Sequence, residues 1–184
     1  MRWMWIDKIV EFEPGRRMVA VKNVSLAEEH LHDHFPAEQG GPALPVMPAS
    51  LMIEGMAQTA GILVGAVNEF REKVILAKIV SARFDAEVVP GETIRYDATL
   101  ERMEAAGAST SGIVQRLRHA GADESPTWET IGRIELMFSH LDQNLAGLEF
   151  PKENFVFSEN FRTILRTAGL EQLAPAPAGG FQSD

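Results

Sequence analysis

Two ionisable side chains, His34 and Glu54, are candidates for acid–base chemistry in a chain of 184 residues with five histidines. Glu54 lies in an otherwise apolar stretch, where a buried carboxylate without a partner is rare. Desolvation would raise the pKa of such a carboxyl and allow it to donate a proton. An imidazole, with an ordinary pKa of about 6.5, would be the matching base. Two groups held in opposite protonation states are a recurrent signature of acid–base catalysis.

A long helix over about residues 48–68 is predicted to carry Glu54, since the stretch opens with a proline and continues with helical spacing. Its apolar side chains cover most of the circumference, so other structure is expected to surround it. One stripe differs, because Glu54, Gln58, Gly61 and Gly65 share a face.

The start of this helix adds a third chemical group. Backbone N–H groups at Ala49 and just after it have no intrahelical partner, so they can stabilise a developing oxyanion. Together with a histidine base and a carboxylic acid, they suit removal of a proton next to a carbonyl. A leaving group would then depart from the carbon one position further on.

Strand patterns account for most of the remaining chain. A hairpin is predicted for residues 6–13 and 18–24, around a Pro-Gly turn. Further strands are predicted over 74–80, 82–89, 93–102, 108–118 and 127–138, with turns at 89–92 and 121–125. In the third of these, alternation places Ile94, Tyr96, Ala98 and Leu100 on one face. One apolar helix followed by antiparallel strands is an α+β pattern, and a curved sheet would bury the helix.

Residues 30–48 are predicted to form a long ordered loop. His30, His32 and His34 alternate there, and in an extended segment they would face one side. A metal site is one interpretation, because imidazole binds zinc, iron or copper. The other is a set of polar surface histidines. The chain has no cysteine, which excludes disulfides and thiolate ligands.

The composition limits the partners. A formal net charge of −9 argues against a uniform nucleic-acid-binding surface. Residues 1–7 lack the apolar run of a signal peptide, so a cytoplasmic location is expected. Residues 51–67 approach the length of a membrane span, but Glu54 within them makes a span costly. We therefore expect a buried helix and no membrane partner.

The order of these motifs resembles the β-hydroxyacyl-acyl-carrier-protein dehydratases of type II fatty acid synthesis. The family pattern is His-Phe-Pro-Gly, a short gap, Pro-x-x-Pro-Gly, and a helix containing Glu-Ala-Met-Ala-Gln. This chain has His34-Phe35-Pro36, then Pro45-Val46-Met47-Pro48-Ala49, then Glu54-Gly55-Met56-Ala57-Gln58. The first hairpin and the segments 82–84 and 89–92 are also similar, so the resemblance extends over about residues 5–140.

The resemblance implies a hot-dog fold, in which a curved antiparallel β-sheet wraps around one long central α-helix. This domain would occupy residues 1–140. A C-terminal extension, 141–184, would follow, with a short helix over 161–173 and disorder in about its last ten residues.

The resemblance also assigns roles to residues. His34 would remove the C2 proton and Glu54 would protonate the departing C3 hydroxyl, directly or through water. The Ala49 N–H would bind the thioester carbonyl, and Gln58 would hold the Glu54 carboxyl. The substrate-binding set is Phe35, Val46, Pro48, Ala49 and Gln58.

The implied partners are thioesters of acyl carrier protein or coenzyme A, with no metal or organic cofactor. The implied assembly is a homodimer in which His34 and Glu54 come from opposite subunits, with a trimer of dimers as a larger alternative. An acidic carrier needs a local basic patch on the enzyme. The candidates for that patch are Arg16, Arg17, Lys78, Arg83, Arg116 and Arg118.

Three departures from the family pattern keep other interpretations open. The inserted loop, 37–44, is about six residues longer than usual, Ala49 replaces a glycine, and the tail is extended. The alternatives are an acyl thioesterase, in which Glu54 would activate water or attack the thioester, and a non-catalytic acyl-thioester-binding subunit. Double-bond isomerisation is disfavoured, because the isomerase subgroup typically has Asp at the position of Glu54. Gly61 and Gly65 either leave room for an acyl chain or allow close helix–sheet packing, which we favour.

Overall fold

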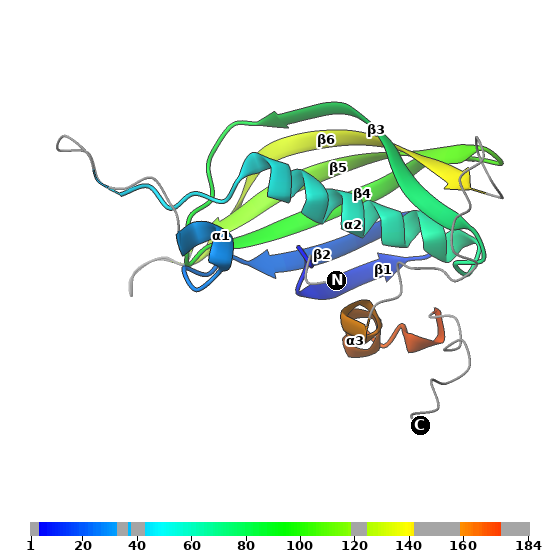
Figure 1. Cartoon of the computed structure of the whole chain (residues 1–184), viewed down its shortest axis with the longest axis horizontal. Coiled ribbons are helices and arrows are strands. Elements are labelled where there is room, and N and C mark those ends of the chain that lie inside the picture. Colours follow the sequence, from blue (N-terminus) through cyan, green and yellow to red (C-terminus); the bar gives the residue numbers. More distant parts are fainter. Residues whose placement is uncertain (1–3, 33–36, 38–42, 119–124, 142–158, 174–184) are drawn as a thin grey trace, which may run out of the picture.

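The computed structural model describes residues 4–32, 37, 43–118, 125–141 and 159–173. In these residues one long helix, α2 (Ala49–Val67), lies across one face of a six-stranded antiparallel sheet (Figure 1). The strands are β1 (Lys8–Glu13), β2 (Arg17–Asn23), β3 (Lys73–Phe84), β4 (Thr93–Glu104), β5 (Gly107–Arg118) and β6 (Thr127–Leu141). Their order in the sheet is β1-β2-β4-β5-β6-β3, so β1 and β3 form the two edges.

Local sequence patterns explain the central strands. β1 and β2 form the predicted hairpin, with Phe12 opposite Met18 and a turn in which Gly15 has a φ of 67°. In β4 the predicted alternation is confirmed, because Ile94, Tyr96 and Ala98 are fully buried and Leu100 is partly buried. α2 packs against these side chains of β4.

The strand that follows α2 differs from the prediction. Residues 74–80 and 82–89 were expected to be two strands, but β3 is a single strand of 12 residues. It pairs with β6 from Lys73 opposite Leu141 to Phe84 opposite Gly132. The pairing register shifts twice along the way, between Leu76 and Lys78 and between Ile79 and Ser81, and the pairing continues past both shifts.

The segment before α2 is also partly different from the prediction. His30 and His32 belong to a short helix, α1 (Glu29–His32), where a loop was expected. The expectation that the histidines face one side applied to an extended segment, and this part of the segment is helical instead. Most of the predicted inserted loop, and residues 121–124 of the predicted turn, lie outside the described residues.

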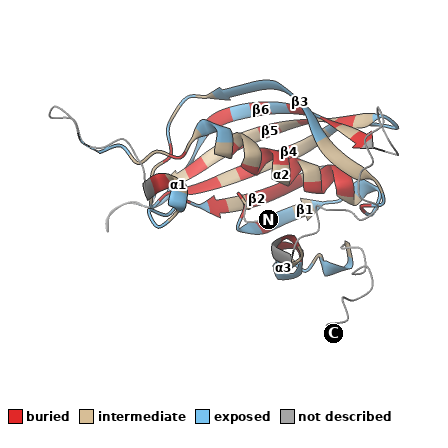
Figure 2. Cartoon of the chain, viewed as in Figure 1, coloured by how far each residue is buried: buried red, intermediate tan, exposed pale blue. Residues whose placement is uncertain are grey.

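The core lies between α2 and the sheet, and Figure 2 shows the buried residues along this layer. Met52, Met56, Ala60 and Leu63 of α2 are nearly or fully buried. Among the described residues α2 is the one helix with the length and composition to cross a membrane, but 56% of its apolar window is buried inside the protein. Its position under the sheet is that of a core helix, as predicted.

The described part of the C-terminal extension covers one edge of the sheet. α3 (Glu159–Thr167), followed by the short helix η2 (Glu171–Leu173), lies beside β1 (Figure 1). It buries Phe161, Ile164 and Leu165, so the first part of the predicted helix is confirmed, but α3 ends at Thr167 and the rest of the predicted helix is interrupted before η2. Residues 142–158 and 174–184, which include the predicted disordered tail, lie outside the described residues.

Candidate active site

Glu54 lies on the second turn of α2 with its side chain partly exposed. Gln58, one turn further along, donates a hydrogen bond from Nε2 to Oε1 of Glu54 over 3.0 Å. The predicted pairing of these two residues is therefore confirmed. Gln58 binds Oε1 of Glu54, and the other carboxyl oxygen is Oε2.

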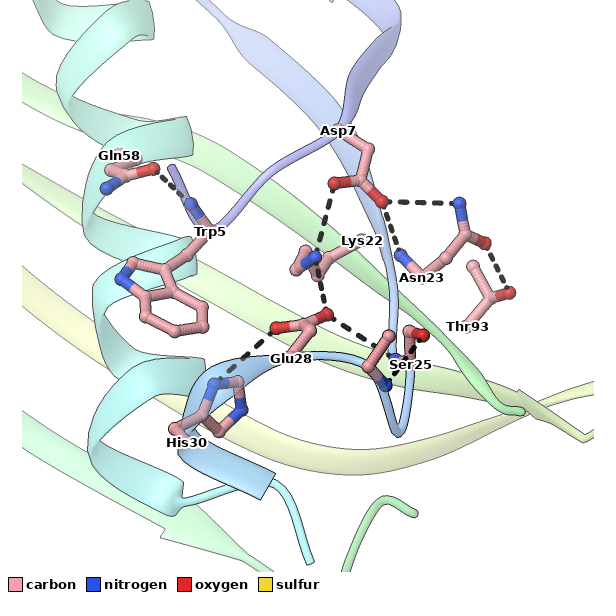
Figure 3. A network of polar contacts seen from close by, with 10 residues as sticks. Trp5, Asp7, Lys22, Asn23, Ser25, Glu28, His30, Gln58 and Thr93 are labelled. Atoms are coloured by element: carbon pink, nitrogen blue, oxygen red, sulfur yellow. Dashed lines mark hydrogen bonds and ion pairs between the residues drawn. The ribbon is translucent and has the colours of Figure 1, made fainter. Parts of the chain in front are cut away.

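The other end of the Gln58 amide is held by the N-terminal segment. The backbone N–H of Trp5 donates to Gln58 Oε1 over 2.9 Å (Figure 3). Trp5 was not among the predicted site residues, because it is separated from Gln58 by 53 positions and no local pattern links the two.

A polar network fixes Trp5 against the elements around it (Figure 3). The indole ring contacts the His30 ring edge-on, with the centroids 5.0 Å apart. His30 Nδ1 lies 3.6 Å from Glu28 Oε2, and Glu28 Oε1 accepts a hydrogen bond from Lys22 Nζ over 2.8 Å. Lys22 is buried and lies 3.3 Å from an oxygen of Asp7. The network thus joins the N-terminal segment, β2 and α1 beside α2.

The residue after Glu54 is a glycine because a tyrosine ring approaches the helix there. A Cβ added to Gly55 would lie 2.4 Å from Cζ of Tyr96, so no larger side chain fits without movement. Burial, with the nearby charges of Asp7 and Glu28, raises the pKa of Tyr96 far above its ordinary value. The phenol is therefore neutral, and its buried hydroxyl has no hydrogen-bond partner among the described residues.

The amino end of α2 is partly exposed among the described residues. Pro48 precedes the helix without a side-chain cap hydrogen bond, and the first turn contains no acidic residue. Leu51 and Met52 donate their N–H groups to Pro48 O, and Ala49 is exposed. Val46 is partly exposed just before this turn. The predicted substrate-binding residues 46, 48 and 49 thus border one accessible helix end.

The predicted base cannot be placed beside these groups, because His34 and Phe35 lie outside the described residues. α1, which ends at His32, lies at the same end of the molecule as the amino end of α2 (Figure 1). Within the described ranges no three His, Asp or Glu side chains form a group suited to a metal ion. His34 and the side chain of His32, two members of the metal interpretation, lie outside those ranges.

The six cations considered for a carrier-binding patch do not form a free positive cluster. Five of them have acidic partners within 4 Å: Arg16 with Glu13, Arg17 with Asp97, Arg83 with Asp85, Arg116 with Glu129, and Arg118 with Glu92. Hydrogen bonds to Asp97 and Glu11 raise the pKa of Arg17 above its ordinary value. Lys78, the sixth, is exposed on the edge strand β3. A carrier-binding patch on these residues therefore stays a prediction.

The two glycines further along the Glu54 stripe differ. A Cβ on Gly65 would lie 2.6 Å from the ring of Phe70, so this glycine serves close packing, as favoured from the sequence. Gly61 is partly exposed, and a Cβ there would make an ordinary 3.5 Å contact with Phe138. Close packing is therefore established at Gly65, whereas Gly61 does not require it.

A long helix across a strongly curved antiparallel sheet defines the hot-dog class of proteins. The dehydratase heterocomplex ApeI:P from Xenorhabdus doucetiae shares this fold, with a TM-score of 0.53 and 16% sequence identity over 76% of this chain and 84% of that chain. The FabA-like domain model matches residues 2–119, and the chain belongs to this family.

Curated relatives agree with this assignment. The 3-hydroxyacyl-[acyl-carrier-protein] dehydratase FabZ of Clostridium tetani is 36% identical over 111 residues, which cover 60% of this chain and 74% of that protein. The protein of the same name from Pelotomaculum thermopropionicum is 36% identical over 138 residues, covering 74% of this chain and 87% of that relative.

Proposed function

We propose that this protein is a 3-hydroxyacyl-thioester dehydratase that uses His34 as the base and Glu54 as the acid. The observation that carries the proposal is the carboxyl of Glu54, held by Gln58 one turn from the uncapped start of α2, in a chain of the FabA-like family. The enzyme is a hydro-lyase, and acyl carrier protein is the expected carrier because its FabZ relatives are named for that substrate.

The proposed reaction converts a 3-hydroxyacyl thioester into its trans-2-enoyl product. The Ala49 N–H donates to the thioester carbonyl oxygen, which takes up charge as the C2 proton leaves. His34 accepts that proton, and the C–H electron pair forms the new C2–C3 double bond. Glu54 donates its proton to the C3 hydroxyl, which departs as water. Phe35, Val46 and Pro48 would border the thioester.

The second subunit is part of the proposal, because His34 and Glu54 are expected to meet across a dimer interface. The edge strand β3 exposes Leu76, Ile79 and Val80. An uncovered strand edge with apolar side chains is a pairing surface. Among the described residues α3 contacts the opposite edge, β1, so β3 is the edge that we assign to a second copy. A trimer of dimers, a cytoplasmic location and a domain boundary near residue 140 stay predictions.

The test is a dehydration assay with 3-hydroxyacyl chains on acyl carrier protein and on coenzyme A, followed by enoyl absorbance. His34→Ala and Glu54→Gln are each expected to lower kcat by at least about a hundredfold, the usual contribution of a general acid or base. Their melting temperatures should match the wild type. Mixing the two inactive variants should restore part of the activity, because a mixed dimer contains one complete site.

Other outcomes would contradict the proposal. Normal turnover by either single variant would remove that residue from the mechanism. Release of free thiol without enoyl absorbance would identify a thioesterase, and tight binding without turnover would identify a non-catalytic acyl-binding subunit. Two inactive variants that stay inactive after subunit exchange would place both residues in one subunit.

A further inference from the structure

The side-chain amide of Gln58 has two chemically different ends. Its Nε2 group can only donate hydrogen bonds and its Oε1 atom can only accept them. A half-turn about the last side-chain bond exchanges the two ends at almost no steric cost. The atom that Gln58 presents to Glu54 therefore depends on what holds the other end of the amide.

The backbone N–H of Trp5 holds that other end. It is a donor, so it selects Oε1 of Gln58, at 2.9 Å (Figure 3). This choice turns Nε2 toward Glu54 Oε1, at 3.0 Å. In the reversed orientation the NH₂ group would face the Trp5 N–H, donor against donor. The amide oxygen would then face the Glu54 carboxyl and would accept the proton that Glu54 needs for the substrate.

The geometry points to Trp5 as a positioning residue whose backbone N–H fixes the Gln58 amide and so keeps the acid proton on Oε2 of Glu54. The inference rests on the proposed dehydratase function and adds to it the atom that carries the proton. With Oε1 accepting from Gln58, Oε2 is the oxygen from which the C3 hydroxyl would receive the proton.

The N-terminal segment is held firmly enough for this task. Trp5 is 9% exposed, and its ring packs edge-on against His30. Two residues later the Asp7 N–H donates to Val21 O over 2.7 Å, and the Asp7 carboxylate accepts from the Asn23 N–H, also over 2.7 Å. The Trp5 amide is thus fixed from both sides, by the α1 network and by β2.

The test compares two variants that differ in whether position 5 has a backbone N–H to donate to Gln58. Trp5→Pro lacks both the N–H and the indole ring, whereas the matched control Trp5→Ala lacks only the ring. Trp5→Pro is expected to have a kcat about 10- to 100-fold below that of Trp5→Ala, since small misplacement of a reacting group costs up to about a hundredfold. KM should stay nearly the same, because the substrate contacts are not altered.

A double-mutant cycle separates positioning from general damage to the fold. In a Gln58→Leu background the Trp5 N–H has no amide to orient, so Trp5→Pro and Trp5→Ala should have equal kcat values. An equal difference between them in both backgrounds would overturn the inference, as would equal kcat values in the native background.

A second route covers the case in which the proline variant does not fold. Replacing Trp5 by its α-hydroxy acid exchanges the N–H for an ester oxygen and keeps the ring, and the same fall in kcat is expected. An unchanged kcat would overturn the inference. If the wild type dehydrates no hydroxyacyl thioester, the proposed function itself fails; if it does and the cycle is additive, only the role of Trp5 fails.

Discussion

The two halves of α2 have the same backbone geometry but different surroundings. In the amino half, Glu54 and Gln58 are partly exposed and joined in a chain of hydrogen bonds that ends at Trp5. In the carboxyl half, Gly65 is buried under the ring of Phe70, which meets Phe161 of α3 edge-on with the centroids 6.1 Å apart. One half contains the candidate acid and the other closes the core.

The way α2 ends explains the second half. The Phe70 N–H donates to Gly65 O over 2.8 Å, and both Glu69 and Phe70 have positive φ values, of 52° and 55°. This backbone turns Phe70 onto the last turns of the helix, an arrangement common at helix ends. The extension then backs Phe70 with Phe161, so α3 contributes to the core.

One substitution in each half of α2 tests whether the two halves differ in this way. Gly55→Ala is expected to have the larger effect, because the new Cβ would meet the fully buried Tyr96 ring at 2.4 Å. Alanine normally favours a helix by about 0.5–1 kcal/mol, and overpacking costs about 1–3 kcal/mol. The helix must shift beside Glu54, so kcat should fall by about tenfold or more. Steady-state kinetics and urea unfolding measure both effects, and an unchanged kcat would contradict the expectation.

Gly65→Ala is the matched substitution in the carboxyl half. Its Cβ would lie 2.6 Å from the Phe70 ring, which must move away from the helix. The free energy of unfolding should fall by about 1–2 kcal/mol, from the same balance of helix preference and overpacking. The kcat of the folded enzyme should match the wild type, because the strain lies three turns from Glu54. A loss of kcat similar to that of Gly55→Ala would show that the two halves are coupled.

Whether a feature could be predicted from the sequence depends on how many residues separate the groups that interact. The helix, the hairpin and the buried face of β4 depend on local periodicity, and all three are confirmed. The pairing of Gln58 with Glu54 is one helical turn long and is also confirmed. The continuity of β3 was missed because its register shifts depend on β6, about 55 residues away. The Trp5 contact was missed for the same reason, and α1 because four residues carry too little periodicity to detect.

The smallest expected effect concerns Tyr96, beneath the amino half. Its buried hydroxyl has no hydrogen-bond partner among the described residues, and burying such a group costs about 1–3 kcal/mol. Tyr96→Phe removes the hydroxyl and keeps the ring against Gly55, so stability at neutral pH should be unchanged or higher by about 1 kcal/mol. Urea unfolding at neutral pH measures this change, and a large loss of stability would show that the hydroxyl has a partner in the protein.

The Tyr96→Phe variant also tests the raised pKa of Tyr96, because that shift predicts the direction in which stability changes with pH. Above about pH 10, the ordinary tyrosine pKa, the unfolded chain releases the phenol proton, whereas the folded protein keeps it. The unfolded state then binds fewer protons, so this group lowers stability as the pH rises, by up to about 1.4 kcal/mol per unit. Unfolding one pH unit above that value should show a shallower loss in Tyr96→Phe than in the wild type. Equal losses in the two proteins would mean that Tyr96 ionises in the folded state, and that the layer between β4 and the amino half of α2 is open to water.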